Sequence, residues 1–477
     1  MWEYINNTLM RFRECFSREA TFKWFVIVII GLMIRNDHMG VTSIIRELAI
    51  NPKHYESIIH FFRSTSWRLS KIVKTWVGIV CTSGLVYRVH NSPLLIGDGV
   101  DQSKEGRKMP GVKKLVQESE NSSKPRYIHG HKFGAIGILL GTPKKFFCTI
   151  LSMRLHDSNS IISEWKGDEL AKESHVVRLV REACDVAAKI GEKCRIALDR
   201  YYLTVNALET LSQFGGKGFS NPMLHIVTKA KKNATAYEYP VRKHKRGAPP
   251  KKGDKIKLLD LFSSKSDLFI KAAVTMYGKL EEVEFFVTDL LWGKKLYYPL
   301  RFVLVKYHGK FAILASTDLT LSGEAIIEIY AFRFKIESAF RELKQVIAGF
   351  AYRFWSAYMP KLNRFSKNQQ MDEKVAAIDC KLKKSKIISA FNAIEGFAMF
   401  AVIACGILQM TALQFHKTIS ASAFRWLRTS RSEIPSEATS AHFLGKTFFN
   451  TFHFSPDLTI NRFIRDAQSD THDVSIV

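Results

Sequence analysis

The pattern of apolar and polar positions changes character along the chain. In the first part, apolar and aromatic residues recur every three or four positions with basic residues between them, which predicts helices. Short apolar runs bounded by Gly, Pro and polar residues then replace this pattern and predict strands. These changes divide the chain into a helical N-terminal region (1–90), a first core segment (91–228), an insertion (229–310), a second core segment (311–415) and a C-terminal region (416–477).

The first core segment combines strands with two helices. Its first apolar run ends in Asp98, and two later runs are separated by five turn-forming residues, as in a hairpin. In order, we expect strands at 93–98, 133–140 and 146–153, a helix at 161–191, a strand at 194–199, a helix at 205–214 and a strand at 223–228. Three antiparallel strands followed by a parallel pair is the order of the ribonuclease-H-like fold. The predicted fold class is α/β, with a ribonuclease-H-like mixed-sheet core, an inserted β-rich subdomain and helical N- and C-terminal regions.

The insertion differs from the core in charge as well as in pattern. Residues 229–257 hold eleven Lys and Arg against two acidic residues, and the centre of this stretch has the composition of an exposed loop. Strand-like runs follow at 282–288 and 300–306. The core pattern resumes at 311–315 and leads into a helix.

Two apolar stretches raise the question of a membrane. Residues 24–34 are only eleven, too few to span about 30 Å of hydrocarbon. Residues 390–413 are more numerous, but Asn392, Glu395 and Gln409 interrupt them. Both stretches are therefore predicted to be buried helices, and no membrane partner is expected.

The helix expected at 330–344 is the most informative segment for function. It contains no Pro or Gly, and at about 100° per residue five side chains share one stripe: Tyr330, Arg333, Glu337, Arg341 and Lys344. A single acid in a basic stripe suits a site that holds a metal ion beside a polyanion. The alternative is a solvated face, in which (i, i+4) ion pairs contribute a few tenths of a kcal/mol each.

Two predicted strands add carboxylates to this stripe. Asp98 and Asp199 each end an apolar run, and functional residues gather at the carboxyl ends of strands in open α/β sheets. Either Asp alone more often caps a turn. Together with Glu337, however, the two Asp residues provide the hard oxygen ligands that Mg²⁺ prefers. Two such ions about 3.5–4 Å apart activate a water or hydroxyl and stabilise the leaving oxygen of a phosphodiester.

Charge narrows the class of partner. The 477 residues contain 71 Lys and Arg against 44 Asp and Glu, a net charge of +27. This excess indicates an anionic partner, with nucleic acid favoured over an anionic membrane surface. The seven cysteines form no C-x-x-C pair, which fits buried thiols in a reducing compartment.

The stripe also resembles a family signature. Tyr330, Arg333, Glu337 and Lys344 match Tyr-x2-Arg-x3-Glu-x6-Lys, the signature of the IS-four-like, cut-and-paste insertion-sequence transposases of the DDE class. The segments LLIGDGV and IALDRYY resemble the first and second acidic strands of that family, and the resemblance covers about residues 90–415. Many relatives follow the first Asp with Ser or Thr and then Thr, whereas Gly and Val follow here. Asp101 is therefore the alternative to Asp98.

The resemblance implies a metal-dependent phosphoryl transferase. Asp98, Asp199 and Glu337 would hold two Mg²⁺ or Mn²⁺ ions, and water and then a 3′-hydroxyl would attack phosphodiesters at transposon ends and in target DNA. Tyr330, Arg333 and Lys344 would contact DNA phosphates. The implied partners are double-stranded DNA, as terminal inverted repeats and target, and a second copy of the chain in a synaptic complex. The implied location is the nucleoid of a prokaryotic cytoplasm.

Other residues are expected at the DNA, and two other functions stay open. Position beside the site or basic composition suggests DNA contacts by Lys104, Arg107, Lys108, Arg242, Lys243, Lys245, Arg246 and Arg341. Trp292 is a candidate for base stacking, with an ordinary core Trp as the alternative. The N-terminal basic helices are expected to bind the terminal repeats. The other functions are a ribonuclease-H-like nuclease without strand transfer and an inactive, DNA-binding descendant of a transposase.

Overall fold

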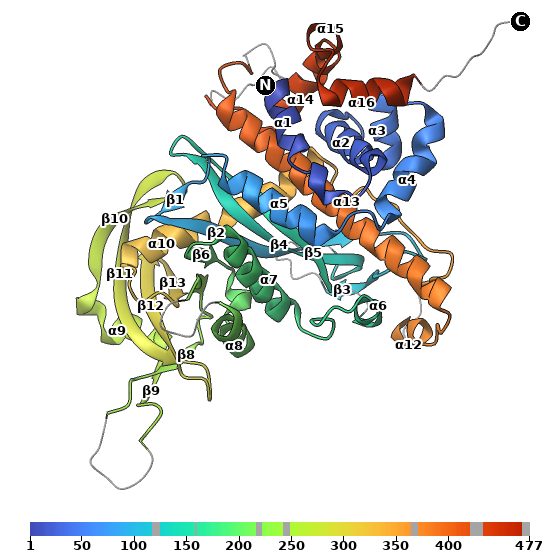
Figure 1. Ribbon diagram of the computed structural model, residues 1–477. Coiled ribbons are helices and arrows are strands. Elements are labelled where there is room, and N and C mark those ends of the chain that lie inside the picture. Colours follow the sequence, from blue (N-terminus) through green and yellow to red (C-terminus); the bar gives the residue numbers. More distant parts are fainter. Residues whose placement is uncertain are drawn as a thin grey trace, which may run out of the picture.

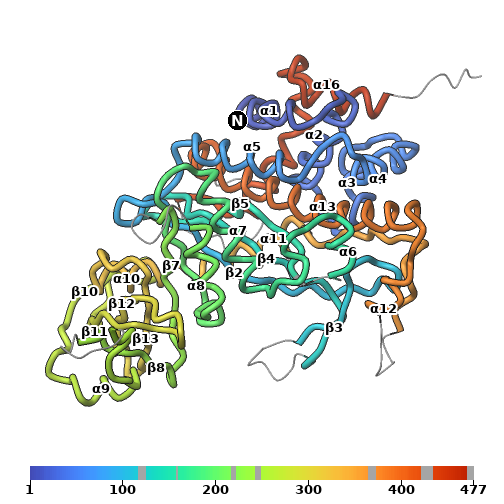
Figure 2. Tube along the Cα trace, turned by 60° about the horizontal axis from the view of Figure 1, so that its bottom comes forward, coloured from blue at the N-terminus to red at the C-terminus, as the bar shows by residue number. Residues whose placement is uncertain are grey.

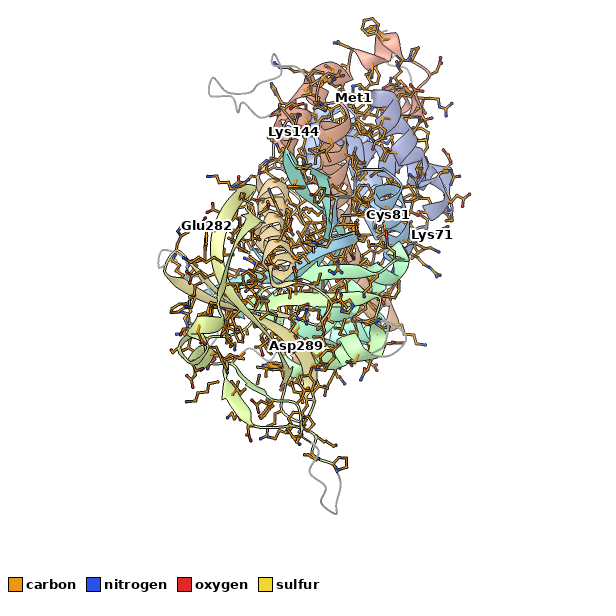
Figure 3. All side chains as sticks on the ribbon, turned by 90° about the vertical axis from the view of Figure 1, so that its left-hand side faces the viewer. Met1, Lys71, Cys81, Lys144, Glu282 and Asp289 are labelled. Carbon is orange, nitrogen blue, oxygen red and sulfur yellow. The ribbon has the colours of Figure 1, made fainter. Side chains whose placement is uncertain are left out.

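The computed structural model shows a mixed α/β protein with one large sheet and helices packed around it (Figure 1). Helices from both ends of the chain lie together, and the inserted strands lie at the other end of the molecule, as the positions of Met1 and Asp289 show in Figure 3. The structure describes residues 1–116, 125–157, 160–215, 222–241, 249–363, 371–419 and 433–469.

The central sheet is mixed. Within the described residues, neighbouring strands follow the order β5-β4-β2-β6-β7-β13-β12-β11. The pairs β2–β4 and β4–β5 are antiparallel, whereas β2–β6 and β6–β7 are parallel. These strands are β2 (Ser92–Ser103), β4 (Tyr127–Thr142), β5 (Lys145–Asp157), β6 (Cys194–Ala197), β7 (Leu224–Lys229), β11 (Lys279–Trp292), β12 (Tyr298–Tyr307) and β13 (Lys310–Ser316). Shorter or outer strands are β1 (Arg88–Val89), β3 (Lys113–Val116), β8 (Thr235–Tyr237), β9 (Lys255–Lys257) and β10 (Ile270–Met276).

The first strand corrects one prediction. Asp98 does not end β2, because the strand continues to Ser103 and stays paired with β4 as far as Ser103↔Gly130. The apolar run marks only the part of β2 that lies between two strands. The parallel pairing with β6 ends at Ile96↔Ala197, so Asp98 still lies just beyond the last residue of β2 that is flanked on both sides.

The inserted strands extend the core sheet instead of forming a sheet of their own. Strand β13 pairs antiparallel with β7 of the core and with β12 of the insertion. The insertion nevertheless has a second, smaller apolar cluster that includes Leu258, Leu300 and Phe302. Strand β10 was not predicted, and β11 and β12 are longer than expected. Strand β11 begins with the charged segment KLEE, so its apolar run alone underestimates its length.

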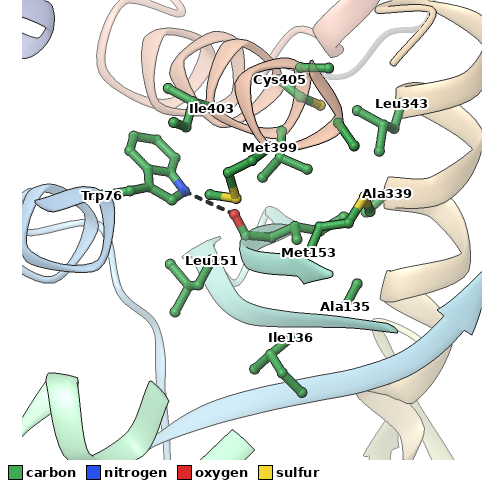
Figure 4. Close-up of a cluster of buried hydrophobic side chains, with 14 of the residues drawn as sticks. Trp76, Ala135, Ile136, Leu151, Met153, Ala339, Leu343, Met399, Ile403 and Cys405 are labelled. Atoms are coloured by element: carbon green, nitrogen blue, oxygen red, sulfur yellow. Dashed lines mark hydrogen bonds between the residues drawn. The ribbon is translucent and has the colours of Figure 1, made fainter. Parts of the chain in front are cut away.

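Helices cover both faces of the core strands. Ser152 and His156 of β5 bond to Glu182 of α7 (His175–Ile190), whereas Met153 points to the opposite face, toward α11 (Lys335–Gln345) and α13 (Lys381–Gln414). On that second face a cluster of buried side chains joins α5 (Leu69–Cys81), β5, α11 and α13, and the Trp76 indole donates a hydrogen bond to the carbonyl oxygen of Ile150 at 2.9 Å (Figure 4). The expected helix at 161–191 is divided into α6 and α7, with a left-handed Gly167 between them.

The two apolar stretches are buried helices, as predicted. Helix α2 (Glu19–Ile34) is buried from Phe25 to Ile34, and α13 is buried from Ala393 to Leu413. Among the described helices, α13 alone is long and apolar enough to cross a membrane, but its apolar window lies entirely inside the protein. Two buried polar side chains of α13 have partners: Glu395 accepts from Lys166 at 2.7 Å, and Gln409 donates to Glu437 at 2.9 Å.

The two ends of the chain pack against each other. The C-terminal helices α14 and α16 contact α2, and Figure 2 shows α16 beside the N-terminal helices. The remaining helices are α1 (Trp2–Met10), α3 (Val41–Glu47), α4 (Tyr55–Arg63), α5 (Leu69–Cys81), α6 (Ser160–Trp165), α8 (Val205–Phe214), α9 (Leu261–Ser264), α10 (Gly323–Ala331), α12 (Met371–Ala376), α14 (Glu437–Phe448), α15 (Thr451–Phe454) and α16 (Thr459–Gln468).

Candidate active site

Asp98 lies on the face of β2 that is directed toward α11. Its Oδ1 accepts a hydrogen bond from the backbone N–H of Gly99 at 2.7 Å, and its Oδ2 lies 3.5 Å from Arg333 Nη1. The pKa of Asp98 is raised to about 6, mainly by burial; the Gly99 hydrogen bond and Arg333 lower it, and the charges of Asp199 and Glu337 make smaller contributions that raise it. The three predicted carboxylates therefore act on one another electrostatically.

Asp199 follows β6 and begins a 3-10 turn at Arg200–Tyr202. Its backbone carbonyl accepts from the N–H of Tyr202 at 3.0 Å and from the Thr228 hydroxyl at 2.9 Å. The residue thus stands two positions beyond Ala197, as Asp98 stands two positions beyond Ile96, the strand partner of Ala197. Equal offsets on adjacent parallel strands place both aspartates at the same edge of this strand pair.

The predicted helical stripe is present with a tightened turn in its middle. Helix α10 ends at Ala331, a 3-10 turn covers Phe332–Phe334, and α11 then begins at Lys335. Tyr330 belongs to α10, Arg333 to the 3-10 turn, and Glu337, Arg341 and Lys344 to α11. A 3-10 turn inside a longer helix often marks a functional position.

Arg333 joins two of the carboxylates. Its Nη2 lies 2.6 Å from Glu337 Oε1, in one of the (i, i+4) pairs expected for a solvated face, while its Nη1 faces Asp98. Arg341 instead contacts Glu342 at 2.9 Å. Lys344 Nζ donates to the backbone carbonyl of Asp101 at 3.3 Å, which connects α11 to the outer half of β2.

The carboxylates fit divalent metal ions by their chemistry but do not form a closed ligand set. Over the described ranges, no group of three His, Cys, Asp or Glu side chains lies close enough to hold a metal ion as it stands. The Arg333 guanidinium is the cation that Asp98 and Glu337 contact here. The Glu337 side chain is 59% exposed, and a metal ion would offset the burial and, to a smaller extent, the neighbouring charges that raise the pKa of Asp98.

An open cleft lies beside these residues. It has a volume of about 330 Å³ and is lined by Asp199, Arg200, Lys229, Tyr277, Tyr330, Ala331, Arg333 and Phe334. Three cationic side chains against one acid favour an anionic ligand. Burial raises the pKa of the Tyr330 hydroxyl to about 12, so it remains a hydrogen-bond donor at neutral pH.

Tyr277 is a cleft residue that the sequence analysis missed. It lies in the β10–β11 turn, is 60% exposed, and its ring centroid is 5.3 Å from that of Phe334. Tyr277 and Gly278 both have positive φ, as a two-residue hairpin turn requires. The signal in the sequence was this Tyr-Gly pair between two strands, one of which was not predicted.

Asp98 and Asp101 point to opposite faces of β2, because they are three positions apart on a regular strand. Asp98 faces Arg333, whereas the Asp101 carboxylate lies 3.2 Å from Lys132 Nζ of β4. Of the two candidates for the first acid, only Asp98 faces the helix that carries Glu337.

Lys104 corrects another prediction. Its ammonium group donates to the backbone carbonyls of Phe350 and Tyr352 and lies 3.6 Å from the centre of the Tyr352 ring. Burial lowers the pKa of Lys104 to about 7. This side chain is thus held inside the protein, where it fixes the chain that follows α11, and it is poorly placed to contact DNA.

The other predicted DNA contacts differ in their surroundings. Arg107 is exposed, and Lys108 donates to the Ala357 carbonyl at 3.1 Å. Trp292 is partly buried against the second apolar cluster and does not line the cleft, so the core alternative describes its position. Arg242, Lys243, Lys245 and Arg246 lie outside the described residues.

Comparison with known proteins adds no family to this description. No protein-family model matches the chain, and no curated protein matches it. The functional argument therefore rests on the residues and their geometry.

Proposed function

We propose that the protein is a DDE transposase, which cleaves DNA at transposon ends and joins these ends to target DNA. One observation carries the proposal. Asp98 and Asp199 stand at equal offsets beyond one parallel strand pair, and Glu337 is connected to Asp98 through Arg333. Three carboxylates that influence one another beside a basic cleft suit two-metal phosphoryl transfer.

The strand order supports a ribonuclease-H-like core. Strands β2, β4 and β5 are the antiparallel first three, and β6 and β7 add in parallel beside β2. In this reading the first acid is on the first strand and the second follows the fourth strand. The third is on a helix that comes after the inserted strands.

The protein's own side chains would divide the work of binding and orientation. Arg200, Lys229 and Arg333 line the cleft and would bind backbone phosphates, which positions DNA without reading its sequence. Tyr330 would donate a hydrogen bond to a phosphate oxygen. Asp98, Asp199 and Glu337 would hold two Mg²⁺ or Mn²⁺ ions, which supply an activated nucleophile and stabilise the leaving oxygen.

Arg333 lies between the carboxylates and the cleft. Its guanidinium contacts Asp98 and Glu337, two of the acids that would hold metal ions, and it also lines the cleft. A guanidinium in this position would bind a DNA phosphate through two parallel hydrogen bonds. Arg333 would thus orient the phosphate next to the carboxylates.

The test uses the full chain with Mg²⁺ or Mn²⁺, a labelled duplex carrying the DNA that flanks the coding region, and a supercoiled plasmid. We expect nicks at the element ends and labelled plasmid as the joined product. Asp199→Asn and Glu337→Gln should abolish both products while gel-shift binding of the end duplex persists.

Two other outcomes would replace the proposal. Cleavage that never yields joined plasmid would indicate a nuclease without strand transfer. Binding of the end duplex without any cleavage, under both metals, would indicate an inactive descendant. If the end duplex binds no better than a scrambled duplex and no cleavage occurs, the protein is not an end-specific transposase.

A further inference from the structure

A chain of partly buried hydrogen bonds runs along the α7 side of the core sheet. Tyr202 OH lies 2.9 Å from His175 Nε2, His175 Nδ1 lies 3.0 Å from His156 Nδ1, and His156 Nε2 lies 2.9 Å from a carboxylate oxygen of Glu182. Ser152 donates to the other oxygen of that carboxylate. Its members come from β5, from α7 and from the turn after Asp199, and the proposed chemistry uses none of them directly.

The chain fills space that two glycines leave open. A Cβ atom on Gly99 would lie 2.6 Å from His175 Nε2, and a Cβ atom on Gly134 would lie 2.0 Å from His156 Cε1. The two imidazoles therefore pack directly on the backbones of β2 and β4. The N–H of Gly99 donates to Asp98 Oδ1 and so orients this carboxylate. His175 packs against the same glycine from the opposite face of the strand.

The other end of the chain reaches the second acid. Tyr202 closes the 3-10 turn that Asp199 begins, and its N–H donates to the Asp199 carbonyl at 3.0 Å. His175 consequently contacts both acidic segments: the Gly99 backbone on one side and the Tyr202 hydroxyl on the other. It stands behind the strand edge where the two aspartates lie.

Two members of the chain have fixed roles. The Glu182 carboxylate can only accept, so His156 Nε2 donates to it. Burial lowers the pKa of His175 to about 2, so this imidazole is neutral, with one ring nitrogen that donates and one that accepts. Its two nitrogens face His156 Nδ1 and the Tyr202 hydroxyl, and burial raises the pKa of Tyr202, which keeps its proton.

We propose that Tyr202, His175, His156 and Glu182 form a positioning unit that fixes Asp98 and Asp199 relative to each other. The inference rests on the proposed function, since its consequence is the spacing of two metal ions. The unit also explains why glycine follows Asp98: the imidazole of His175 occupies the volume that a Ser or Thr side chain would need. Residues behind metal ligands commonly tune affinity in this way.

The first experiment compares two tyrosines that each bond to a buried histidine. Tyr202→Phe removes the hydroxyl that bonds to His175, and Tyr352→Phe removes the hydroxyl that lies 2.7 Å from His131 Nδ1, away from the acids. Mn²⁺ affinity is measured without DNA by electron paramagnetic resonance, together with the thermal midpoint. We expect both variants to lose similar heat stability, while Tyr202→Phe alone weakens Mn²⁺ binding by about tenfold.

The second experiment tests the glycine without deleting any buried polar group. Gly99→Ser should weaken Mn²⁺ binding by about tenfold, because its side chain collides with His175. The double variant Gly99→Ser with His175→Ala should recover part of that affinity, although it lacks one more member of the chain. A serine that acted only through its own hydroxyl would give no recovery.

Asp199→Asn tests the proposed metal site independently of the positioning unit. If Asp199→Asn lowers Mn²⁺ affinity and Tyr202→Phe behaves as Tyr352→Phe does, the positioning unit is refuted and the metal site stands. If Asp199→Asn leaves Mn²⁺ affinity unchanged, the metal site fails, and the positioning role fails with it. Should the Tyr202 variant not fold, the Gly99 pair decides: equal affinities of Gly99→Ser and the double variant would refute the unit.

Discussion

The two faces of β2 satisfy their polar groups in opposite ways. Toward α11, Asp98 shares the single guanidinium of Arg333 with Glu337, beside an open cleft. Toward α7, Tyr202 and His156 are buried, His175 and Glu182 are partly buried, and the four side chains have partners at 2.9–3.0 Å. One strand thus separates a face where two carboxylates share one guanidinium from a face where four side chains form a continuous hydrogen-bonded chain.

This difference indicates which face can exchange its charged partners for a ligand. Groups near solvent that are only partly neutralised, such as Glu337, can exchange a guanidinium for a metal ion at little cost. A buried hydrogen-bonded chain cannot change one member without leaving another unpaired, which costs about 1–3 kcal/mol. We therefore assign binding and chemistry to the α11 face and positioning to the α7 face.

Replacing Asp98 of β2 should change DNA cleavage the most, and Asp101 of the same strand provides the control. Asp98→Asn should lower DNA cleavage by at least about 10³-fold, the loss expected when several kcal/mol of metal-based stabilisation disappear. Asp101→Asn should retain activity within about fivefold, because Asp101 faces Lys132 on the other side of the strand. Single-turnover cleavage of the end duplex measures both. An active Asp98→Asn beside an inactive Asp101→Asn would reverse the assignment of the faces.

A smaller loss of cleavage is expected when Arg333, which contacts both Asp98 and Glu337, is replaced. Arg333→Ala should lower single-turnover cleavage by about 10²-fold, since a guanidinium aimed at a phosphate contributes stabilisation in the transition state. Arg333→Lys should recover only part of this loss, because an ammonium group keeps the charge but not the two parallel donors. Full activity of Arg333→Ala would show that Arg333 only neutralises carboxylates.

The features of the α11 face that could be predicted were local in the sequence. Asp98 and Asp199 were visible because each follows an apolar run, and Glu337 because helical periodicity sets it in a basic stripe. Of the strands up to β7, the order of β2, β4, β5, β6 and β7 could be predicted because turn residues separate their apolar runs, whereas the short strands β1 and β3 were not predicted. How far β2 extends could not, since its outer half is polar and is held by pairing with β4.

The features of the α7 face could not be predicted, because they depend on contacts between distant segments. His156, His175, Glu182 and Tyr202 have no common spacing, and only the packing of α7 on β5 brings them together. The burial of Lys104 could not be predicted for the same reason, because it depends on contacts with Phe350 and Tyr352, which follow α11. A lysine in the sequence indicates a cationic group, but only the folded structure shows whether that group is available to an anionic ligand or bonds to the protein's own backbone.

A smaller effect should appear in heat stability. Burial raises the pKa of Asp98 to about 6, above its value of about 4 in an unfolded chain. The folded state then holds the proton more tightly, so this contribution to stability is present at low pH and is lost as pH rises from about 4 to about 6. Asp98→Asn cannot lose a proton, and without metal it should melt about 1–3 °C higher than the wild type above pH 6.

The control for this prediction is the metal ion. Calorimetry from pH 4 to pH 8 should show the advantage of Asp98→Asn vanish near pH 4, and saturating Mn²⁺ should stabilise the wild type but not the variant. A difference that stays constant with pH would mean that the substitution acts through packing and not through the charge of Asp98.

The smallest effect is expected at the outer end of the α11 stripe. Arg341 is 61% exposed and contacts Glu342, its neighbour in sequence, in an ion pair of a kind that contributes about 0–1 kcal/mol. Arg341→Gln should therefore leave cleavage within about twofold of the wild type, in contrast to Arg333→Ala. DNA binding measured between 50 and 200 mM salt makes the test sharper, since each lost phosphate contact lowers the slope of log affinity against log salt by about one. An unchanged slope would limit the binding face to the cleft around Arg333, whereas a slope lowered by one would extend it along α11 to Arg341.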